Sequence, residues 1–398
     1  MSDPSSPPQR RLRALDWLRG IAVLVMAECH VFNALLAPEY RLARWFAAVN
    51  WINGLVAPAF LLVSGGVMGM NLQKRWEQGT AKLWRRVGQI FIVAYLLHLP
   101  TPLLWQFFGS RGSHLIELWT KMDILQCVAG SLAIILLLVP VTRTPRIHRG
   151  ACAALGILAA TSATAMASWA SDVSAPKWLL NYLWPTGVGK FPLVPWAAFP
   201  LIGVWLGPAI FCSLPSVWRA GLPASRTDVA RQGPRRPGRS QLETAPTTTR
   251  QSLRSVVAGV IFLAASTFMT SPIAYDGPFV FERMGWVLMG LAGCCWLDQP
   301  WRGTKWILQF GELSLWSYTV HLIIVYGSCI SLGLDTLAPR AATWWVRRTN
   351  PGVPPVLGFS PFVVLCWFAA VVFVTALVVR WRAKNLQRRA NVRILPAR

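Results

Sequence analysis

Charged residues are scarce in this chain, and acidic residues are the scarcest of them. Only 14% of the 398 residues are Asp, Glu, Lys or Arg, and just 15 of these are acidic. A soluble globular protein carries about 25% charged residues. No small-residue cleavage pattern follows the polar start, so we expect no cleaved signal peptide. The shortage of charge argues against an ordinary soluble domain and indicates that lipid is the main solvent.

Paired cysteine spacing is also lacking. The eight cysteines lie almost wholly within apolar stretches, which indicates small buried side chains rather than a disulfide framework or a zinc site. The formal charge of +24 does not indicate a nucleic-acid partner, because the basic residues sit in short blocks between apolar runs and not on a separate domain. We expect neither a metal nor a nucleic acid to bind.

Long apolar runs occupy most of the chain. They recur at about the twenty-residue length that crosses a bilayer core as a helix, and they are too continuously apolar for the strands of a membrane barrel. The predicted fold class is therefore all-α, a polytopic integral membrane protein. We expect ten spans, near residues 15–37, 50–70, 87–108, 121–141, 150–170, 192–215, 255–271, 279–297, 307–333 and 359–380.

Basic residues are distributed unevenly between the predicted loops. Blocks of Lys and Arg precede the first span, follow each even-numbered span and fill the end of the chain, whereas the other loops hold few. By the positive-inside rule both chain ends are cytoplasmic. The predicted organisation is a tail at 1–12, six spans within 13–218, a disordered cytoplasmic loop at 219–253, four spans within 254–382 and a basic tail at 383–398.

The first predicted span carries ionisable residues that a membrane tolerates poorly. Arg19 and His30 are eleven residues apart, and at about 100° per residue they return to within roughly 20° of the same side of a helix. Asp16 lies three residues before Arg19 on that stripe, where the two can pair. We therefore expect Arg19 and His30 to face one interior chamber, with Arg19 near the cytoplasmic boundary and His30 in the outer half of the membrane.

Two interpretations stay open for each of these residues. Arg19 is either a boundary residue that obeys the positive-inside rule or part of an anion site for a phosphate-bearing donor. His30 is either a packing histidine held by a hydrogen bond or a general base or acyl carrier, since histidine titrates near neutral pH.

The fourth predicted span begins with two polar candidates. Asp123 and Gln126 lie at about the depth of His30, where an aspartate can orient an imidazole. The alternative for Asp123 is a boundary residue that pairs with Lys121.

Other spans hold weaker candidates. His321 shares a helical face with Ser314 and Tyr318, and it either links helices by hydrogen bonds or takes part in chemistry. His98 is interpreted as a packing histidine. Ser64 lies among small residues, where close helix packing is the default and a narrow ligand the alternative.

Proline and polar residues are expected to interrupt two spans. The second span contains Asn53 and Pro58, and the sixth contains Pro192, Pro195 and Pro200. Proline removes a helix hydrogen bond and clashes with the preceding turn. We expect a local break or kink at both places.

Several of these residues belong to a recognisable pattern. The run from Arg13 to Gly20 resembles the signature of the heparan-α-glucosaminide N-acetyltransferase catalytic family and its bacterial relatives. Arg19, followed by His30, also resembles the first-span motif of the wider bacterial membrane O-acyltransferases. Further matches to the first family follow in order at residues 57–65, 123–126, 193–196 and 311–321.

The resemblance implies a membrane enzyme that takes an acetyl group from cytoplasmic acetyl-CoA and delivers it to a sugar or glycolipid on the external side. It implies His30 as the base or acyl carrier, and Asp123 and Gln126 as residues that line the centre. With the candidates from the spans themselves, the expected catalytic residues are His30, Asp123 and His321. The residues expected to bind the donor are Asp16, Arg19, Ser64, Lys74, Arg75, Arg85, Arg86 and Gln126.

The chain departs from the lysosomal branch of that family. That branch has asparagine at the position matching His30, and its histidine in the following lumenal loop has no counterpart in residues 38–50 of this chain. We therefore expect a bacterial member in the inner membrane and do not transfer the lysosomal substrate.

A second class of function stays open. The same intramembrane charges could line the pathway of a transporter or flippase for a lipid-linked or anionic solute, although no inverted repeat is visible. The sequence also leaves open the acceptor, O- against N-acylation, direct against two-step transfer, the acyl chain length, and whether the chain forms a homo-oligomer.

Overall fold

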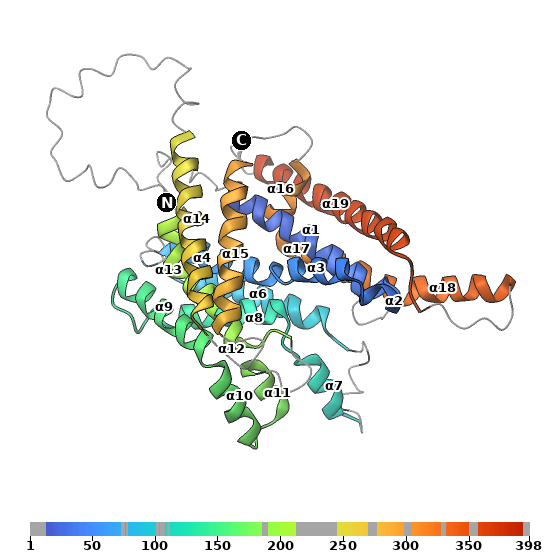
Figure 1. The fold of residues 1–398 in the computed structure, drawn as a ribbon, viewed down its shortest axis with the longest axis horizontal. Helices are drawn as coiled ribbons and strands as arrows, with labels where there is room; N and C mark the ends of the chain where they lie inside the picture. The colour runs from blue at the N-terminus through green and yellow to red at the C-terminus, as the bar shows by residue number, and fades with distance from the viewer. Residues whose placement is uncertain are drawn as a thin grey trace, which may run out of the picture.

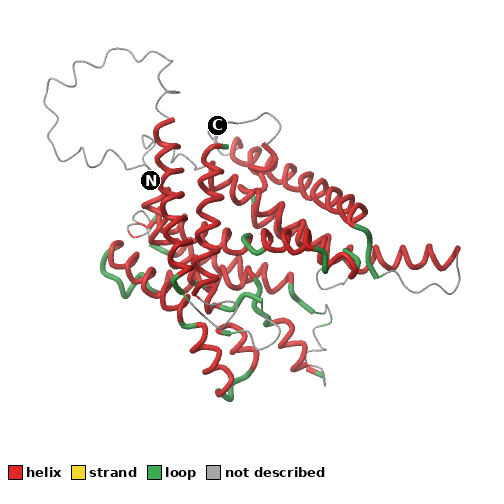
Figure 2. The backbone as a smooth tube through the Cα atoms, in the orientation of Figure 1, coloured by secondary structure: helices red, strands yellow, loops and turns green. Residues whose placement is uncertain are grey.

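The protein is helical throughout the part that its computed structural model describes. Within that part the only β feature is an isolated bridge between Leu36 and Phe359, and Figure 2 draws helices joined by loops. The described residues are 13–72, 76, 79–100, 103, 108–109, 112–184, 190–211, 245–269, 277–297, 305–327, 332–349 and 357–392.

The helices follow one another as labelled in Figure 1. Their bounds are α1 (Arg13–Leu35), α2 (Pro38–Arg41), α3 (Arg44–Asn53), α4 (Val56–Met70), α6 (Ala81–Leu97), α7 (Gly112–Trp119), α8 (Ile124–Leu137), α9 (Pro145–Thr161), α10 (Ala163–Asp172), α11 (Lys177–Leu183), α12 (Leu193–Trp196), α13 (Ala198–Phe211), α14 (Ala245–Thr267), α15 (Gly277–Trp296), α16 (Lys305–Glu312), α17 (Ser314–Tyr326), α18 (Leu334–Thr349) and α19 (Pro361–Val392).

Helix α1 is the centre of the bundle. It packs against α4, α15, α16, α17 and α19, so segments from both halves of the chain meet on it. Leucine, alanine and methionine favour the helix, and the buried set includes Leu18, Ala22 and Met26. The Arg41 side chain closes its end by donating to the backbone carbonyls of Asn33 and Leu36, both at 3.0 Å.

Helices α4 and α13 lie in backbone contact. A Cβ added at Gly65 would overlap the carbonyl of Pro200 on α13, and Gly69, Gly203 and Gly207 make the same close approach. Lipid supplies no hydrophobic drive between helices, so stabilisation comes from close packing that small residues permit. The small-residue stretch of the second predicted span is therefore a helix-packing surface.

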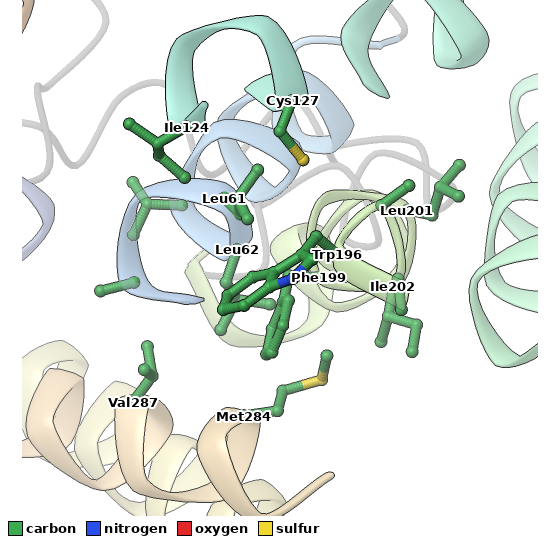
Figure 3. Close-up of a cluster of buried hydrophobic side chains, with 14 of the residues drawn as sticks. Leu61, Leu62, Ile124, Cys127, Trp196, Phe199, Leu201, Ile202, Met284 and Val287 are labelled. Carbon is green, nitrogen blue, oxygen red and sulfur yellow. The ribbon is translucent and has the colours of Figure 1, made fainter. Parts of the chain in front are cut away.

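A buried aromatic pair fills the space beside this contact. Trp196 and Phe199 lie between the leucines of α4 and Met284 of α15 (Figure 3). Their ring centroids are 5.8 Å apart, and Phe199 is fully buried. Aromatic rings bring a large packing area to such a position, so the pair joins α4 and α12–α13 to α15.

Both predicted interruptions correspond to short breaks of one or two residues, and each span still counts as one membrane-length helix. In the second span α3 ends at Asn53 and α4 begins at Val56; in the sixth, α12 ends at Trp196 and α13 begins at Ala198. Elsewhere α14 runs beside α15 (Figure 1), and α6 packs on α8.

The ten predicted spans are supported in part. Each contains a helix. By length and composition, four described helices are able to cross a membrane: 13–35, 44–70, 193–210 and 361–388. The pair α9 and α10, bent by 64°, would make a fifth span. Helices 124–137, 251–267 and 314–326 are apolar but shorter. The count of ten and the cytoplasmic placement of both ends stay predictions.

The predicted loop and tails fall largely outside the described residues. Residues 1–12, 212–244 and 393–398 are not described. Helix α14 begins at Ala245, inside the loop predicted to extend to residue 253, and α19 continues to Val392, inside the tail predicted from residue 383.

Candidate functional site

Polar side chains from four helices gather around the second half of α1. His30 comes from α1, His98 directly follows α6, Asp123 directly precedes α8, and His321 lies on α17. Helix α17 contacts both α1 and α6, and α6 packs against α8. Tertiary packing therefore brings together residues that are up to about three hundred positions apart.

Asp123 and His98 form an ion pair at the junction of α6 and α8. The distance from His98 Nε2 to Asp123 Oδ2 is 2.8 Å, and His98 Nδ1 lies 2.9 Å from the carbonyl oxygen of Ala94. Both ring nitrogens face acceptors, so His98 satisfies both contacts only as a double donor. The geometry favours an imidazolium beside a carboxylate, which is the stronger, charge-assisted form of hydrogen bond.

A tyrosine of α17 reaches the same carboxylate. The Tyr318 hydroxyl donates to Asp123 Oδ2 at 3.4 Å, which is long for a hydroxyl donor. The Tyr318 ring is buried, and its centroid lies 5.6 Å from that of His321. Asp123 thus links α6, α8 and α17.

His30 lies against two other rings of α17. Its Nδ1 is 3.1 Å from the Tyr326 hydroxyl. Its ring centroid is 5.5 Å from the His321 ring and 5.5 Å from the Tyr326 ring. The imidazole therefore faces other polar groups inside the protein.

One ring nitrogen of His321 has a hydrogen-bond partner among the described residues, and the other has none. Nδ1 lies 2.7 Å from the carbonyl oxygen of Ser317, so this nitrogen carries the proton when the ring is neutral. Nε2 is fully buried and has no hydrogen-bond partner among the described residues. A buried unpaired acceptor is costly, so His321 offers a lone pair beside His30.

One cavity opens beside the first half of α1. It has a volume of about 330 Å³. We call it the Arg19 cavity; its polar lining consists of Arg19, Ser64, Asn71, Arg86, Glu312, Ser314 and Tyr318. The rest of the wall is apolar, including Met26 and Val67. The cavity combines two arginines with a narrow apolar interior.

A second cavity lies beside the other half of α1. It has a volume of about 730 Å³. We call it the His30 cavity; its polar lining includes Cys29, His30, Asn33, His98, Lys121, Asp123, Lys190 and Tyr326. This lining offers several donors but a single carboxylate, which already pairs with His98.

The expectation of one shared chamber is corrected by this arrangement. Arg19 and His30 line two different cavities. Tyr318 lines the Arg19 cavity, and its hydroxyl contacts Asp123, which lines the His30 cavity. Arg19 and His30 thus each line a cavity, but not the same one.

Only some of the remaining predicted site residues line a cavity. Asp16 is buried, and a Cβ added at Gly311 would overlap its backbone. Gln126 is fully buried and lines neither cavity. Arg85 also lies outside both linings, whereas its neighbour Arg86 lines the Arg19 cavity. Lys74 and Arg75 lie outside the described residues.

The sequence pattern did not single out Tyr326 and Lys190, and it interpreted His98 as a packing histidine. His98, Tyr326 and Lys190 line the His30 cavity. His98 stands alone in its segment, so no local spacing could connect it with Asp123. The only signal was its position at the end of an apolar run. No group of three or more metal-ligand side chains occurs among the described residues.

Comparison with known families assigns the chain. A search of curated proteins found no match. The sequence model described as "Heparan-alpha-glucosaminide N-acetyltransferase, catalytic" matches residues 11–230, which is more than half of the chain. That match includes α1, α6 and α8, the helices that carry or flank His30, His98 and Asp123. The chain therefore belongs to the heparan-alpha-glucosaminide N-acetyltransferase catalytic family and is a membrane acetyltransferase.

Proposed function

We propose that the protein transfers an acetyl group from cytoplasmic acetyl-CoA to a sugar or glycolipid acceptor on the external side of the bacterial inner membrane. The observation that supports this proposal is the pair of cavities along α1, separated by Tyr318 and Asp123. A donor and an acceptor that enter from opposite sides would meet at that boundary.

The Arg19 cavity suits the donor. The pantetheine arm of acetyl-CoA is narrow and carries the thioester at its tip, which fits a small, mainly apolar cavity. Arg19 and Arg86 would meet the phosphates at the mouth, because guanidinium groups bind phosphate oxygens in a fixed geometry. The predicted cytoplasmic position of Arg19 places this mouth where acetyl-CoA is made available.

The His30 cavity suits the acceptor. Its larger volume leaves room for a sugar, and His30 lies on its wall. His30 would either remove the proton of the attacking hydroxyl or amine or carry the acetyl group itself. His321 Nε2 is placed to receive a proton from the same region, and the Asp123–His98 pair would fix the wall of the cavity.

The test is acetyl transfer by purified protein in proteoliposomes. Radiolabelled acetyl-CoA is supplied on one side and a panel of glucosaminides and glycolipids on the other. We expect His30→Ala to lower the transfer rate by about 10²–10⁴-fold, the usual contribution of a general base. His114→Ala is the matched control, because His114 is exposed on α7 and lines neither cavity.

Two outcomes would overturn the proposal. One is undiminished transfer by His30→Ala protein that is folded. The other is movement of a labelled solute across the membrane without any acetyl transfer, which would instead identify a transporter.

A further inference from the structure

The linings of the two cavities meet where Tyr318 contacts Asp123. Tyr318 lines the Arg19 cavity, and its oxygen lies 3.4 Å from Asp123 Oδ2, which lines the His30 cavity. The thioester carbonyl would have to come to this boundary to be attacked from the other side. The Tyr318 hydroxyl is therefore a hydrogen-bond donor at the place where donor and acceptor would meet.

We propose that Tyr318 is a catalytic residue whose hydroxyl donates a hydrogen bond to the thioester carbonyl oxygen and stabilises the oxyanion formed during acetyl transfer. This inference rests on the proposed function. It assigns a role to a residue of α17, beyond residues 11–230 that match the family model.

The step is balanced as an acyl transfer. The attacking atom forms a bond to the carbonyl carbon, and the carbonyl oxygen takes up negative charge, which the Tyr318 O–H stabilises. The carbon–sulfur bond then breaks, and the electron pair leaves with sulfur as the CoA thiolate. The proton lost by the nucleophile ends on that thiolate, giving CoA and the acetylated acceptor. Donors aimed at such an oxyanion contribute most when the site excludes water.

The present partner of Tyr318 leaves its hydroxyl available. Asp123 already holds a shorter, charge-assisted bond to His98 at 2.8 Å, against 3.4 Å for Tyr318. If Tyr318 released Asp123, the Asp123 carboxylate would still be paired with His98. The Tyr318 hydroxyl can thus turn from Asp123 to a carbonyl oxygen without exposing an unpaired charge.

The competing explanation is a structural one, in which Tyr318 only packs between α1 and α8. A structural residue would affect folding or donor affinity, whereas an oxyanion donor affects the chemical step. Removal of a single oxyanion-hole donor lowers kcat by about 10²–10³-fold, and KM for acetyl-CoA would stay unchanged. The two explanations therefore separate in the kinetic constants.

The experiment compares Tyr318→Phe with the wild type and with Tyr95→Phe in proteoliposomes. Tyr95 lies on α6 and lines neither cavity. The readout is release of CoA from acetyl-CoA, detected as free thiol, with the same panel of glucosaminides and glycolipids as acceptors and with water alone. We expect Tyr318→Phe to lose about 10²–10³-fold in kcat at constant KM, and Tyr95→Phe to match the wild type.

A second pair of variants guards against a folding defect. Tyr318→Gln retains a hydrogen-bond donor, and Tyr318→Leu has a similar size without one, so we expect the glutamine variant to be the faster. A Tyr318→Phe rate within about threefold of the wild type, or equal rates for the second pair, would overturn the role of Tyr318. An inactive wild type, releasing CoA neither to any acceptor of the panel nor to water, would instead overturn the proposed function.

Discussion

Asp123 holds His98 at 2.8 Å and so fastens the end of α6 to the start of α8. This ion pair forms part of the wall of the His30 cavity, with His98 14% exposed and Asp123 22% exposed. A pair that is this well shielded loses little of its attraction to screening by salt. Removing either partner alone would leave the other charge in a poorly solvated position.

The pair can be tested by a double-mutant cycle. We expect Asp123→Asn and His98→Gln each to slow acetyl transfer, and the double variant to be less impaired than the product of the two single effects. For residues in direct contact the coupling is about 0.5–3 kcal/mol. Transfer rates of all four proteins at equal reconstituted amounts give this value. Strict additivity would mean that the two residues act independently.

Donor binding is expected to depend on the arginines of the Arg19 cavity. Arg19→Gln and Arg86→Gln should each weaken acetyl-CoA binding about tenfold, which corresponds to roughly 1.4 kcal/mol per lost phosphate contact. Neither change should affect acetylpantetheine, which lacks the phosphates. Titration calorimetry in detergent measures both ligands. Lys82→Gln is the control, since Lys82 is exposed on α6 and outside both cavities. Equal losses for both ligands would argue against a phosphate role.

The contact between His30 and Tyr326 should tune the reaction without being essential to it. Tyr326→Phe removes the hydroxyl 3.1 Å from His30 Nδ1. A hydrogen bond of this kind contributes about 0.5–1.5 kcal/mol, so we expect a decrease in transfer rate of roughly 2–12-fold. Tyr40→Phe on α2 is the matched change away from the cavities. A loss as large as that of His30→Ala would show that Tyr326 has a more direct role.

Alanine is expected to have opposite effects at a glycine in the α4–α13 contact and at a glycine with open space around it. Gly65→Ala would drive a methyl group into the Pro200 carbonyl and should destabilise the protein by about 1–3 kcal/mol. At Gly88 on α6 an added Cβ would meet no heavy atom within 4 Å, and alanine in a helix is favoured over glycine by roughly 0.5–1 kcal/mol. Thermal unfolding in detergent, followed by tryptophan fluorescence, compares the two. A stabilised Gly65→Ala would contradict the close approach.

Helical spacing was sufficient to predict that polar residues of α1 face the interior of the protein. The positions of Asp16, Arg19 and His30 follow from the turn of one helix, and the structure buries Asp16 and places Arg19 and His30 in cavities. The breaks near Asn53 and Pro195 were likewise local, because proline and polar residues act within a turn or two. The stripe and the breaks can therefore be predicted without knowing which other helices pack against these segments.

The division of the site could not be predicted in the same way. The wall between the cavities depends on Tyr318, which reaches Asp123 across 195 residues of sequence. The role of His98 likewise depends on how α6 packs against α8. The length of an apolar run also overestimates the length of the helix within it. Helices α8 and α17 are both shorter than the apolar runs that contain them.

The contact between Tyr318 and Asp123 also bears on the permeability of the membrane. The proposed function requires the two cavities to open to opposite faces of the membrane, and a continuous water column through both would then let protons cross it. The Tyr318 ring, whose hydroxyl lies 3.4 Å from Asp123 Oδ2, would interrupt such a column where the two cavity linings meet. In the proposed reaction the acetyl group would pass from thioester to acceptor by bond exchange and would need no open pore, so acetyl transfer and a barrier to ions would be compatible.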